Sequence, residues 1–424
     1  MTDTPTSTST ATAAAAATAP PAPAAVAEIP EGPGGPLTGV SVLDLAAVGP
    51  AARCTRILAD YGATVVKVGS VPGGRAAPIQ PPFYAYSGSR YLQRTAIDLK
   101  DPDGRAAFLA LAASVDVVVE SFRPGVVDRL GIGFADLSAV NPRIILCSTT
   151  GYGQYGPHAD RAGHDINYLA VGGYLATTEP RADGGPPVSG ATIADAAGGG
   201  LQAALAVVAA LVGRGVDGPG THLDVSIADG VLWMTSLAVD EHLATGAPVG
   251  PGRNIITGRY ACYDTYRAAD GGWLAVGAIE AKFFSNLCRL LGCPQWIDHQ
   301  LDDDVQDAVR ADFRAAFATR TRDEWSAVLA GADTCVTPVL TAEELVDDEQ
   351  YAARHAIVEA VAAPSDRGAP TRFRQVGPVL AGMTPPAGPV VAGDPARSDT
   401  DRLLGDAGLS AAHIAELRAR GVVA

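Results

Sequence analysis

The sequence predicts an α/β protein, with a Rossmann-like large domain built on a parallel sheet and a smaller α+β domain. From residue 39 to about residue 153, apolar runs of strand length alternate with helical patterns. Strands joined through helices of this length pair in parallel with right-handed crossovers. A hairpin signal near residue 270 then marks a change to antiparallel strands. With 424 residues, 47% of them hydrophobic, the chain is long enough for two domains.

The first residues differ from the rest in composition. Residues 2–28 contain only Ala, Thr, Pro, Ser, Val, Asp and Glu. Such a segment cannot bury enough apolar surface to offset the entropy of ordering it. We therefore expect residues 1–35 to form a disordered Ala/Thr/Pro-rich tail. Because this segment has no basic start, no Leu-rich core and no Arg, neither a secretory signal nor a transit peptide is predicted.

The large domain is expected over residues 36–225. Its strands are predicted from apolar runs, and its helices from helical spacing, with Asp and Pro at the start of the second helix. The predicted strands lie at 39–46, 63–69, 116–122 and within 143–153, and the helices at 51–62 and 101–115. No GxGxxG sequence follows the first strand, so a dinucleotide site of the usual kind is not predicted.

The apolar run at 201–213 predicts a buried helix, because it is shorter than the roughly 20 residues that a membrane-spanning helix needs. A Gly-rich loop, a short strand and another helix are expected directly after it. Residues 226–259 are then predicted to act as a linker.

The small domain is expected over residues 260–345. Two alternating strands meet at Asp270-Gly271-Gly272, a hairpin signal. Helices are predicted at 281–292 and within 305–330, before a strand-like run at 335–340. Residues 346–424 are expected to return to the large domain through Pro-rich chain and a last helix.

Charge and cysteine content limit the classes of partner. The formal net charge of −15 argues against nucleic acid and anionic membrane surfaces, and a polyanionic ligand would need a local basic patch. The six cysteines include no CxxC pair and no zinc-like spacing with His. We therefore expect a cytoplasmic protein with reduced thiols and with no nucleic-acid or membrane partner.

Three residues are candidates for acid–base chemistry. His164 lies in a loop beyond a predicted strand, where open α/β sheets place their sites. Asp195 precedes a glycine run that is expected to open the 201–213 helix and to offer backbone N–H groups to an anion. Glu280 stands at a predicted helix start.

Each of the three also fits a structural role. A loop histidine is often bonded to a carboxylate, Asp before a helix serves as an N-cap, and the helix dipole favours Glu at a helix start. No second His stands at ligand spacing from His164, so no metal site is predicted.

Taken together, the motifs resemble the family III coenzyme A transferases (CaiB/BaiF type), and most closely their α-methylacyl-CoA racemase branch. The similarity runs from about residue 36 to about residue 365. It rests on the segments RILADYGATVVKV, IDLKDPDGR, ESFRPGVVDRLG, GYGQYGPHADRAGHDINYLA, VGAIEAKFF and CVTPVL. GHDINY at 163–168 and VGAIE at 276–280 are the parts that resemble a racemase rather than a transferase.

The resemblance implies racemisation (epimerisation) of 2-methylacyl-CoA thioesters. One base removes the proton next to the thioester, an enolate forms, and an acid on the other face returns a proton. The resemblance assigns His164, supported by Asp195, to one face and Glu280 to the other. It implies that no cofactor is required, because coenzyme A is part of the substrate.

Two alternatives remain open from the sequence. The first is a family III CoA transferase, in which Asp195 acts as a nucleophile and moves CoA between carboxylic acids. The second is an acyl-CoA-binding protein without catalytic activity.

The resemblance also implies an interlocked homodimer and a set of coenzyme A contacts. The site would lie between the large domain of one chain and the small domain of the other. The racemases carry an Arg shortly after the second strand, where this chain has Ser70, and Arg75 is the candidate replacement. The implied contacts are Ile97, Asp98, Leu99, Lys100, Ser121, Phe122, Arg123, Arg129, Gly163, Asp165, Ile166, Asn167 and Tyr168.

Overall fold

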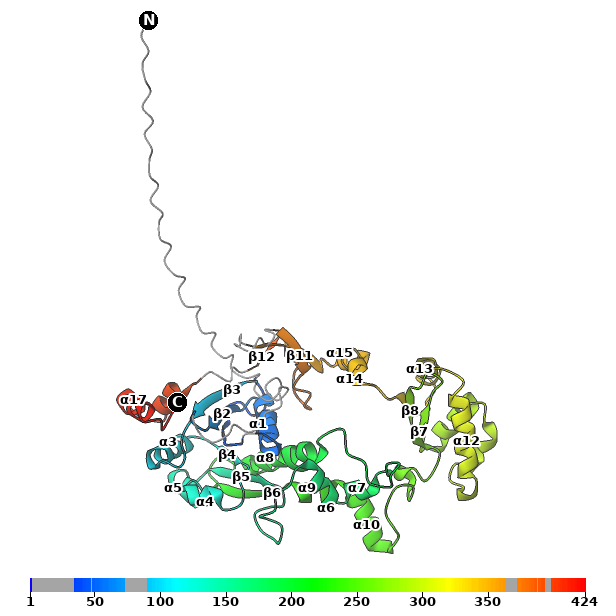
Figure 1. Ribbon diagram of the computed structural model, residues 1–424, viewed down its shortest axis with the longest axis horizontal. Coiled ribbons are helices and arrows are strands. Elements are labelled where there is room, and N and C mark those ends of the chain that lie inside the picture. Colours follow the sequence, from blue (N-terminus) through cyan, green and yellow to red (C-terminus); the bar gives the residue numbers. More distant parts are fainter. Residues whose placement is uncertain (2–33, 47, 73–89, 363–371, 387, 393–397) are drawn as a thin grey trace.

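The computed structural model describes residue 1 and the ranges 34–46, 48–72, 90–362, 372–386, 388–392 and 398–424 (Figure 1). The tail expected over residues 1–35 therefore lies almost wholly outside the described residues, as does Arg75. The described chain forms a large domain, a small domain set apart from it, and a C-terminal segment that returns to the large domain (Figure 1).

The large domain is built on a six-stranded parallel sheet, which confirms the predicted Rossmann-like fold. The strands follow the order β3-β2-β1-β4-β5-β6, so the direction of winding reverses between β1 and β4. At such a switch point, ligands of α/β proteins bind beyond the carboxyl ends of the strands. The strands are β1 (Ser41–Asp44), β2 (Thr64–Gly69), β3 (Leu92–Ala96), β4 (Val117–Glu120), β5 (Ile145–Thr150) and β6 (Thr221–Ser226).

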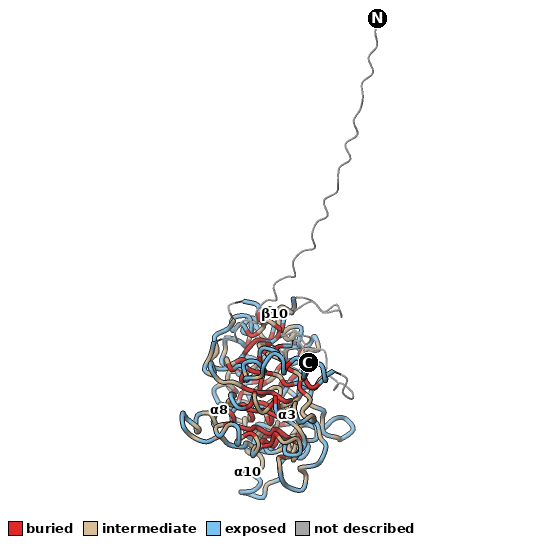
Figure 2. Tube along the Cα trace, turned by 90° about the vertical axis from the view of Figure 1, so that its left-hand side faces the viewer, coloured by how far each residue is buried: buried red, intermediate tan, exposed pale blue. Residues whose placement is uncertain are grey.

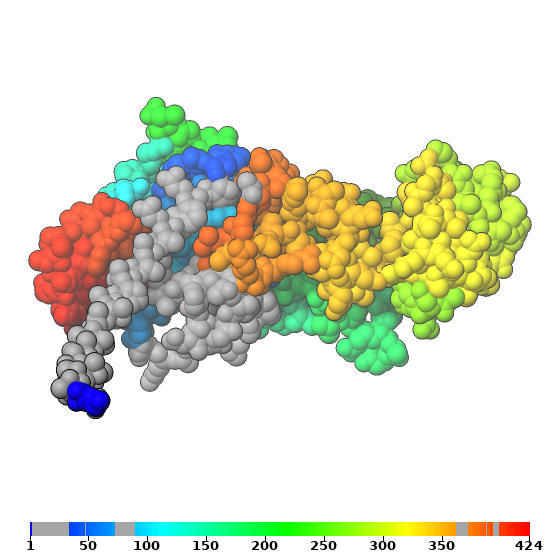
Figure 3. Space-filling view, turned by 90° about the horizontal axis from the view of Figure 1, so that it is seen from above, coloured from blue at the N-terminus to red at the C-terminus, as the bar shows by residue number. Residues whose placement is uncertain are grey.

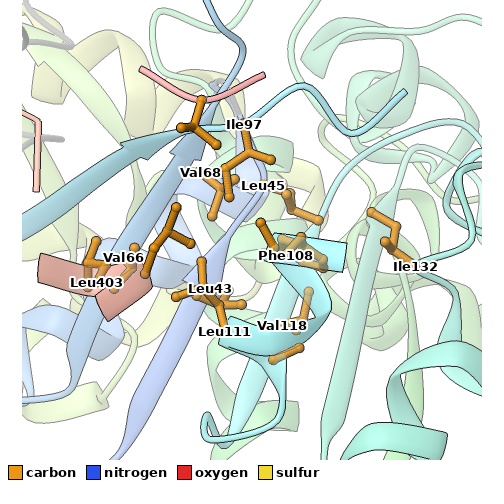
Figure 4. Close-up of a cluster of buried hydrophobic side chains, with 14 of the residues drawn as sticks. Leu43, Leu45, Val66, Val68, Ile97, Phe108, Leu111, Val118, Ile132 and Leu403 are labelled. Carbon is orange, nitrogen blue, oxygen red and sulfur yellow. The ribbon is translucent and has the colours of Figure 1, made fainter. Parts of the chain in front are cut away.

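Helices cover both faces of this sheet, because successive strand residues point to opposite sides. Val42 packs with α1 (Pro50–Asp60) and α8 (Gln202–Arg214) on one face. Leu43 packs on the other face with Phe108 of α3 (Pro102–Ala112) and Leu403 of α16 (Thr400–Asp406) (Figure 4). The buried residues run through the interior, between exposed loops and helix faces (Figure 2).

The small domain has its own antiparallel sheet and its own core, as predicted. The hairpin at Asp270–Gly272 joins its first two strands, and Gly271 has the positive φ of 88° that the turn requires. Its core is aromatic and includes Tyr266, Phe284 and Phe313. The elements are β7 (Tyr263–Arg267), β8 (Trp273–Gly277), β9 (Val336–Pro338), α11 (Ala281–Leu290), α12 (Gln306–Phe317) and α13 (Arg322–Leu329).

The C-terminal segment forms a third sheet that the sequence did not predict. It contains β10 (Ile357–Ala362), β11 (Arg372–Val376) and β12 (Val390–Ala392), and it lies between the two domains when the molecule is seen from above (Figure 3). After α16 and α17 (Ala411–Ala419), Val423 bridges Ile97 beyond β3.

The remaining elements connect these bodies. They are α4 (Val126–Leu130), α5 (Phe134–Val140), α6 (Asp165–Val171), α7 (Tyr174–Thr177), η1 (Ala194–Leu201), α9 (Ile227–Met234), α10 (Ser236–Thr245), η2 (Ile255–Thr257), η3 (Pro294–His299), η4 (Asp303–Val305), α14 (Ala342–Leu345) and α15 (Glu349–Ala353).

Candidate active site

His164 is the residue that caps the N-terminus of α6, at the end of the loop that follows β5. Its backbone N–H donates to Oδ1 of Asn167 at 3.0 Å, and its carbonyl accepts from the N–H of Asn167 at 2.8 Å. The imidazole is exposed and makes no hydrogen bond to any residue that the structure describes. The GHDINY sequence therefore fixes the backbone of His164 and leaves its ring available to a ligand.

Tyr168 anchors this loop from inside the protein. Its side chain is buried, and its hydroxyl donates to the carbonyl of Gly163 at 2.6 Å. A Cβ at Gly163 would lie 2.7 Å from the ring, so the loop needs glycine there. Burial, and then the charge of Asp195, raise the pKa of Tyr168 to about 12. Tyr168 thus remains a neutral donor, while Ile166 and Asn167 of the same motif are exposed.

Asp195 lies beside this loop in η1, a π-helical turn that continues into α8. Its backbone N–H donates to Oδ1 of Asp165 at 2.9 Å, which joins η1 to the start of α6. Burial raises the pKa of the Asp195 carboxyl, and Asp165 adds to the rise. Arg53 and His164 act in the opposite direction, toward the ionised form. The structure therefore brings His164 and Asp195 into one electrostatic site.

The glycine run after Asp195 has a different role from the predicted one. The helix begins at Ala194, so the prediction that the glycines open a helix at residue 201 is wrong. The glycines allow close helix packing instead. A Cβ at Gly199 would lie 2.5 Å from Cβ of Pro50 in α1, and one at Gly198 would lie 3.0 Å from the carbonyl oxygen of Ile227 in α9. Since the run is internal to the helix, it is not the anion-binding helix start that was expected.

Glu280 lies in the small domain, at the N-cap of α11. Its side chain is exposed and does not cap the helix. Nε2 of Gln300 donates to the carbonyls of Ala278 at 3.0 Å and Ile279 at 2.6 Å and so holds the segment before it. Among the described residues, no hydrogen bond or ion pair joins Glu280 to His164 or Asp195. Within one chain, His164 and Asp195 belong to the large domain and Glu280 to the small domain, and the two domains are set apart (Figure 1).

The expected coenzyme A contacts follow two strands at the carboxyl edge of the large sheet. Residues 97–100 follow β3, and residues 121–123 follow β4. Strands β2 and β1 lie between β3 and β4, so the two segments are three strand spacings apart, or about 14 Å across the sheet. A ligand that contacts both segments must therefore be extended along this edge.

Side chains at these two segments differ in exposure. Ile97 is buried against the chain end, and Leu99 packs on the core, whereas Lys100 is exposed. Beyond β4, Arg123 in the loop and Arg129 in α4 are both exposed. Ser70 is exposed directly after β2.

A buried carboxyl group, which the sequence did not single out, supports the segment after β4. Glu120 is only 2% exposed, and its Oε2 accepts from the backbone N–H of Phe122 at 2.7 Å. Burial raises the pKa of Glu120 to about 6, although its hydrogen bonds with Ser148 and Phe122 lower it. The one signal in the sequence is an acidic residue at the end of the apolar strand VVVE.

In the part of the chain that the structure describes, no group of three or more His, Cys, Asp or Glu residues lies close enough to hold a metal ion. Among the described residues, one helix, Ala194–Arg214, is long and apolar enough to cross a membrane by length and composition alone.

Comparison with known proteins gives concordant matches. The family model of CoA-transferase family III matches residues 37–389. The alpha-methylacyl-CoA racemase of Homo sapiens is 36% identical over 323 residues, which cover 76% of this chain and 82% of the human protein. The succinyl-CoA–D-citramalate CoA-transferase of Chloroflexus aurantiacus is 32% identical and covers 76% of this chain and 83% of its own.

The fold is also similar to that of solved structures. The crystal structure of Rv3272 from M. tuberculosis superimposes with a TM-score of 0.70 at 27% identity, covering 84% of this chain and 96% of the other.

Proposed function

The chain belongs to CoA-transferase family III, and we propose that it racemises 2-methylacyl-CoA thioesters by moving the proton next to the thioester carbonyl. The observation that carries this proposal is the exposed imidazole of His164, which is near enough to Asp195 to act on the charge of its carboxyl group. A histidine held by its backbone, with a free ring and an acidic neighbour, is suited to proton transfer.

The proposed reaction uses two bases. His164 takes the α-proton from one face, and the negative charge of Asp195 stabilises the imidazolium that forms. The electrons move onto the thioester oxygen as an enolate. Glu280, in its protonated form, returns a proton to the opposite face. The two faces of the substrate need acid–base groups on opposite sides of it. Glu280 lies on a different domain from His164, which allows such an arrangement.

We propose that Lys100, Arg123 and Arg129 form the basic patch that binds the phosphates of coenzyme A. All three are exposed at the carboxyl edge of the sheet, and the protein as a whole is acidic. Phosphates pair strongly with such side chains. Ser70 offers no charge at its place after β2, so Arg75 is the proposed replacement.

We propose that the active unit is a cytoplasmic homodimer. Helices α8, α9 and α10 expose large apolar side chains, such as Leu205 at 70% and Trp233 at 76% exposure. Large apolar side chains exposed on neighbouring helices are consistent with a protein interface. A second copy would cover the apolar helix Ala194–Arg214, and its small domain would supply the second base.

The test is deuterium incorporation into each pure enantiomer of a 2-methylacyl-CoA in deuterated water. The wild type should exchange both. His164→Ala should lose exchange of one enantiomer by about 10²-fold or more, and Glu280→Gln should lose exchange of the other. His158→Ala, in the same loop, is the matched control and should exchange both.

The alternative, transfer of CoA between carboxylic acids with Asp195 as nucleophile, gives a different result. The wild type would then exchange neither enantiomer but would move CoA from an acyl-CoA to a free acid. Asp195→Asn would abolish that transfer, and His164→Ala would not.

A further inference from the structure

Arg53 lies in the first turn of α1, directly beyond β1 at the switch point of the sheet. This helix packs against η1, which carries Asp195. A Cβ at Gly200 would lie 2.8 Å from Cβ of Arg53, so the stem of the arginine is in close contact with η1. The Cβ of Arg53 therefore lies against the helix that carries Asp195.

The guanidinium of Arg53 has few partners. Nη2 donates to Oγ1 of Thr192, three residues before Asp195. Nε is buried and has no hydrogen-bond partner in the described part of the chain. No described carboxylate lies within ion-pairing distance of it. Because no ion pair cancels its charge, the guanidinium contributes a net positive field to its surroundings.

Polar and charged groups face Asp195 from the elements around it. From α6 and its N-cap, these are the charged Asp165, His164 and the neutral hydroxyl of Tyr168. From α9 the one charged residue is Asp229, which is exposed. Among the groups that shift the pKa of Asp195, Arg53 is the one with a permanent positive charge, and it opposes the effects of burial and of Asp165.

We propose that Arg53 is a positioning residue of the His164–Asp195 site: its contact with Gly200 and its hydrogen bond to Thr192 hold a fixed positive charge against η1, where that charge favours the carboxylate form of Asp195. This inference rests on the proposed acid–base role of Asp195. Without the arginine, the pKa of Asp195 would rise further, because burial and the neighbouring Asp165 both disfavour its charge. A neutral Asp195 cannot stabilise the imidazolium of His164, so the arginine acts on the reaction through two other residues.

The direct test is the titration of Asp195 by NMR in protein labelled at aspartate carboxyl carbons, with Asp195→Asn to identify the resonance. In Arg53→Gln and Arg53→Met, the pKa of Asp195 should rise by about one unit. Two neutral variants are used so that a folding defect in one leaves the other to decide. Arg53→Lys retains the charge and should restore most of the difference.

Two controls separate charge from packing. Arg56→Gln removes the same charge one turn further along α1 and should leave the titration of Asp195 unchanged. Thr192→Val removes the hydrogen bond but not the charge and should shift the titration by less than half as much as Arg53→Gln. An unchanged titration in both neutral Arg53 variants would overturn the inference.

The same variants give an activity readout. The acid limb of the pH profile for α-proton exchange should move to higher pH in Arg53→Gln and return toward the wild-type position in Arg53→Lys. Absence of exchange in the wild type would refute the proposed function, whereas the NMR titration would still decide the role of Arg53.

Discussion

Glu120 is a buried carboxyl group that links the end of β4 to the segment where the proposed coenzyme A contacts lie. In its ionised form it accepts the N–H of Phe122, next to Arg123 of the proposed phosphate patch. Ser148, its other partner, lies 2.9 Å through Oγ from Nε2 of His222 on β6. Burial disfavours the charge, and the two hydrogen bonds offset only part of that cost.

The raised pKa of Glu120 makes a prediction about stability and pH. A group that binds its proton more tightly in the folded state than in the unfolded state destabilises the fold as pH rises through that range. With a shift from 4.5 to about 6, the effect is about 2 kcal/mol. The wild type should therefore lose about 1.6 kcal/mol of this stability relative to Glu120→Gln between about pH 4.5 and pH 7, since the remainder is already lost at pH 4.5. Urea denaturation at both pH values measures it, and parallel curves for the two proteins would refute the prediction.

At the scale of elements, the close packing of η1 and α9 determines where Asp195 lies. Both helices carry glycine at the contact, and neither glycine is needed for a turn. A Cβ at Gly230 of α9 would lie 2.1 Å from the carbonyl oxygen of Gly198. Since backbone cannot yield as a flexible side chain can, the two helices would have to separate.

We therefore expect Gly230→Ala to destabilise the protein by ~3 kcal/mol and to reduce activity, because the displaced η1 moves Asp195. Gly213→Ala is the matched control, since Gly213 lies in α8 and has nothing within 4 Å of its Cβ position. That change should be neutral or stabilising by up to about 1 kcal/mol. Denaturation midpoints and exchange rates of both variants check this, and equal stability of the two would contradict the packing argument.

The elements differ in how well the sequence predicts them, for physical reasons. The central strands β1, β2, β4 and β5 are buried on both faces, and their continuous apolar runs were correctly predicted. β3 (LQRTA) was missed because it is an edge strand with polar side chains. The short strands β10 to β12 were missed because Pro-rich chain separates them.

The features of the candidate site also differ in how well the sequence predicts them. The sequence predicted that His164 lies in a loop beyond a strand; in the structure it follows β5 at the N-cap of α6, with an exposed side chain. The role of the glycines after Asp195 could not be predicted, because their neighbours in α1 and α9 are distant in sequence. Arg53 and Glu120 were missed for the same reason: their effect comes from burial and from contacts across elements.

At the scale of the whole molecule, the chain is two domains tied together by its C-terminal segment. Arg90 is fully buried and makes two hydrogen bonds of 2.6 Å to Asp60 of α1, and a third of 2.8 Å to the carbonyl of Val376 in β11. The third sheet is thus fixed to the large domain. The small domain, which carries Glu280, lies apart from the large sheet (Figure 1).

This arrangement predicts complementation between two inactive variants. If a site joins the large domain of one chain to the small domain of another, His164→Ala and Glu280→Gln chains that are refolded together should regain activity. Half of the dimers are then mixed, and each has one intact site, so about a quarter of wild-type racemisation is expected.

The matched control is co-refolding of His164→Ala with Asp195→Asn. Both changes lie in the large domain, so every mixed dimer has one altered residue at each site and should remain inactive. Folded homodimers of His164→Ala and Glu280→Gln should regain little activity on mixing if the two chains are interlocked, because such chains cannot exchange by simple dissociation. Racemisation that stays at background in the co-refolded mixture of His164→Ala and Glu280→Gln would mean that each site is built within one chain.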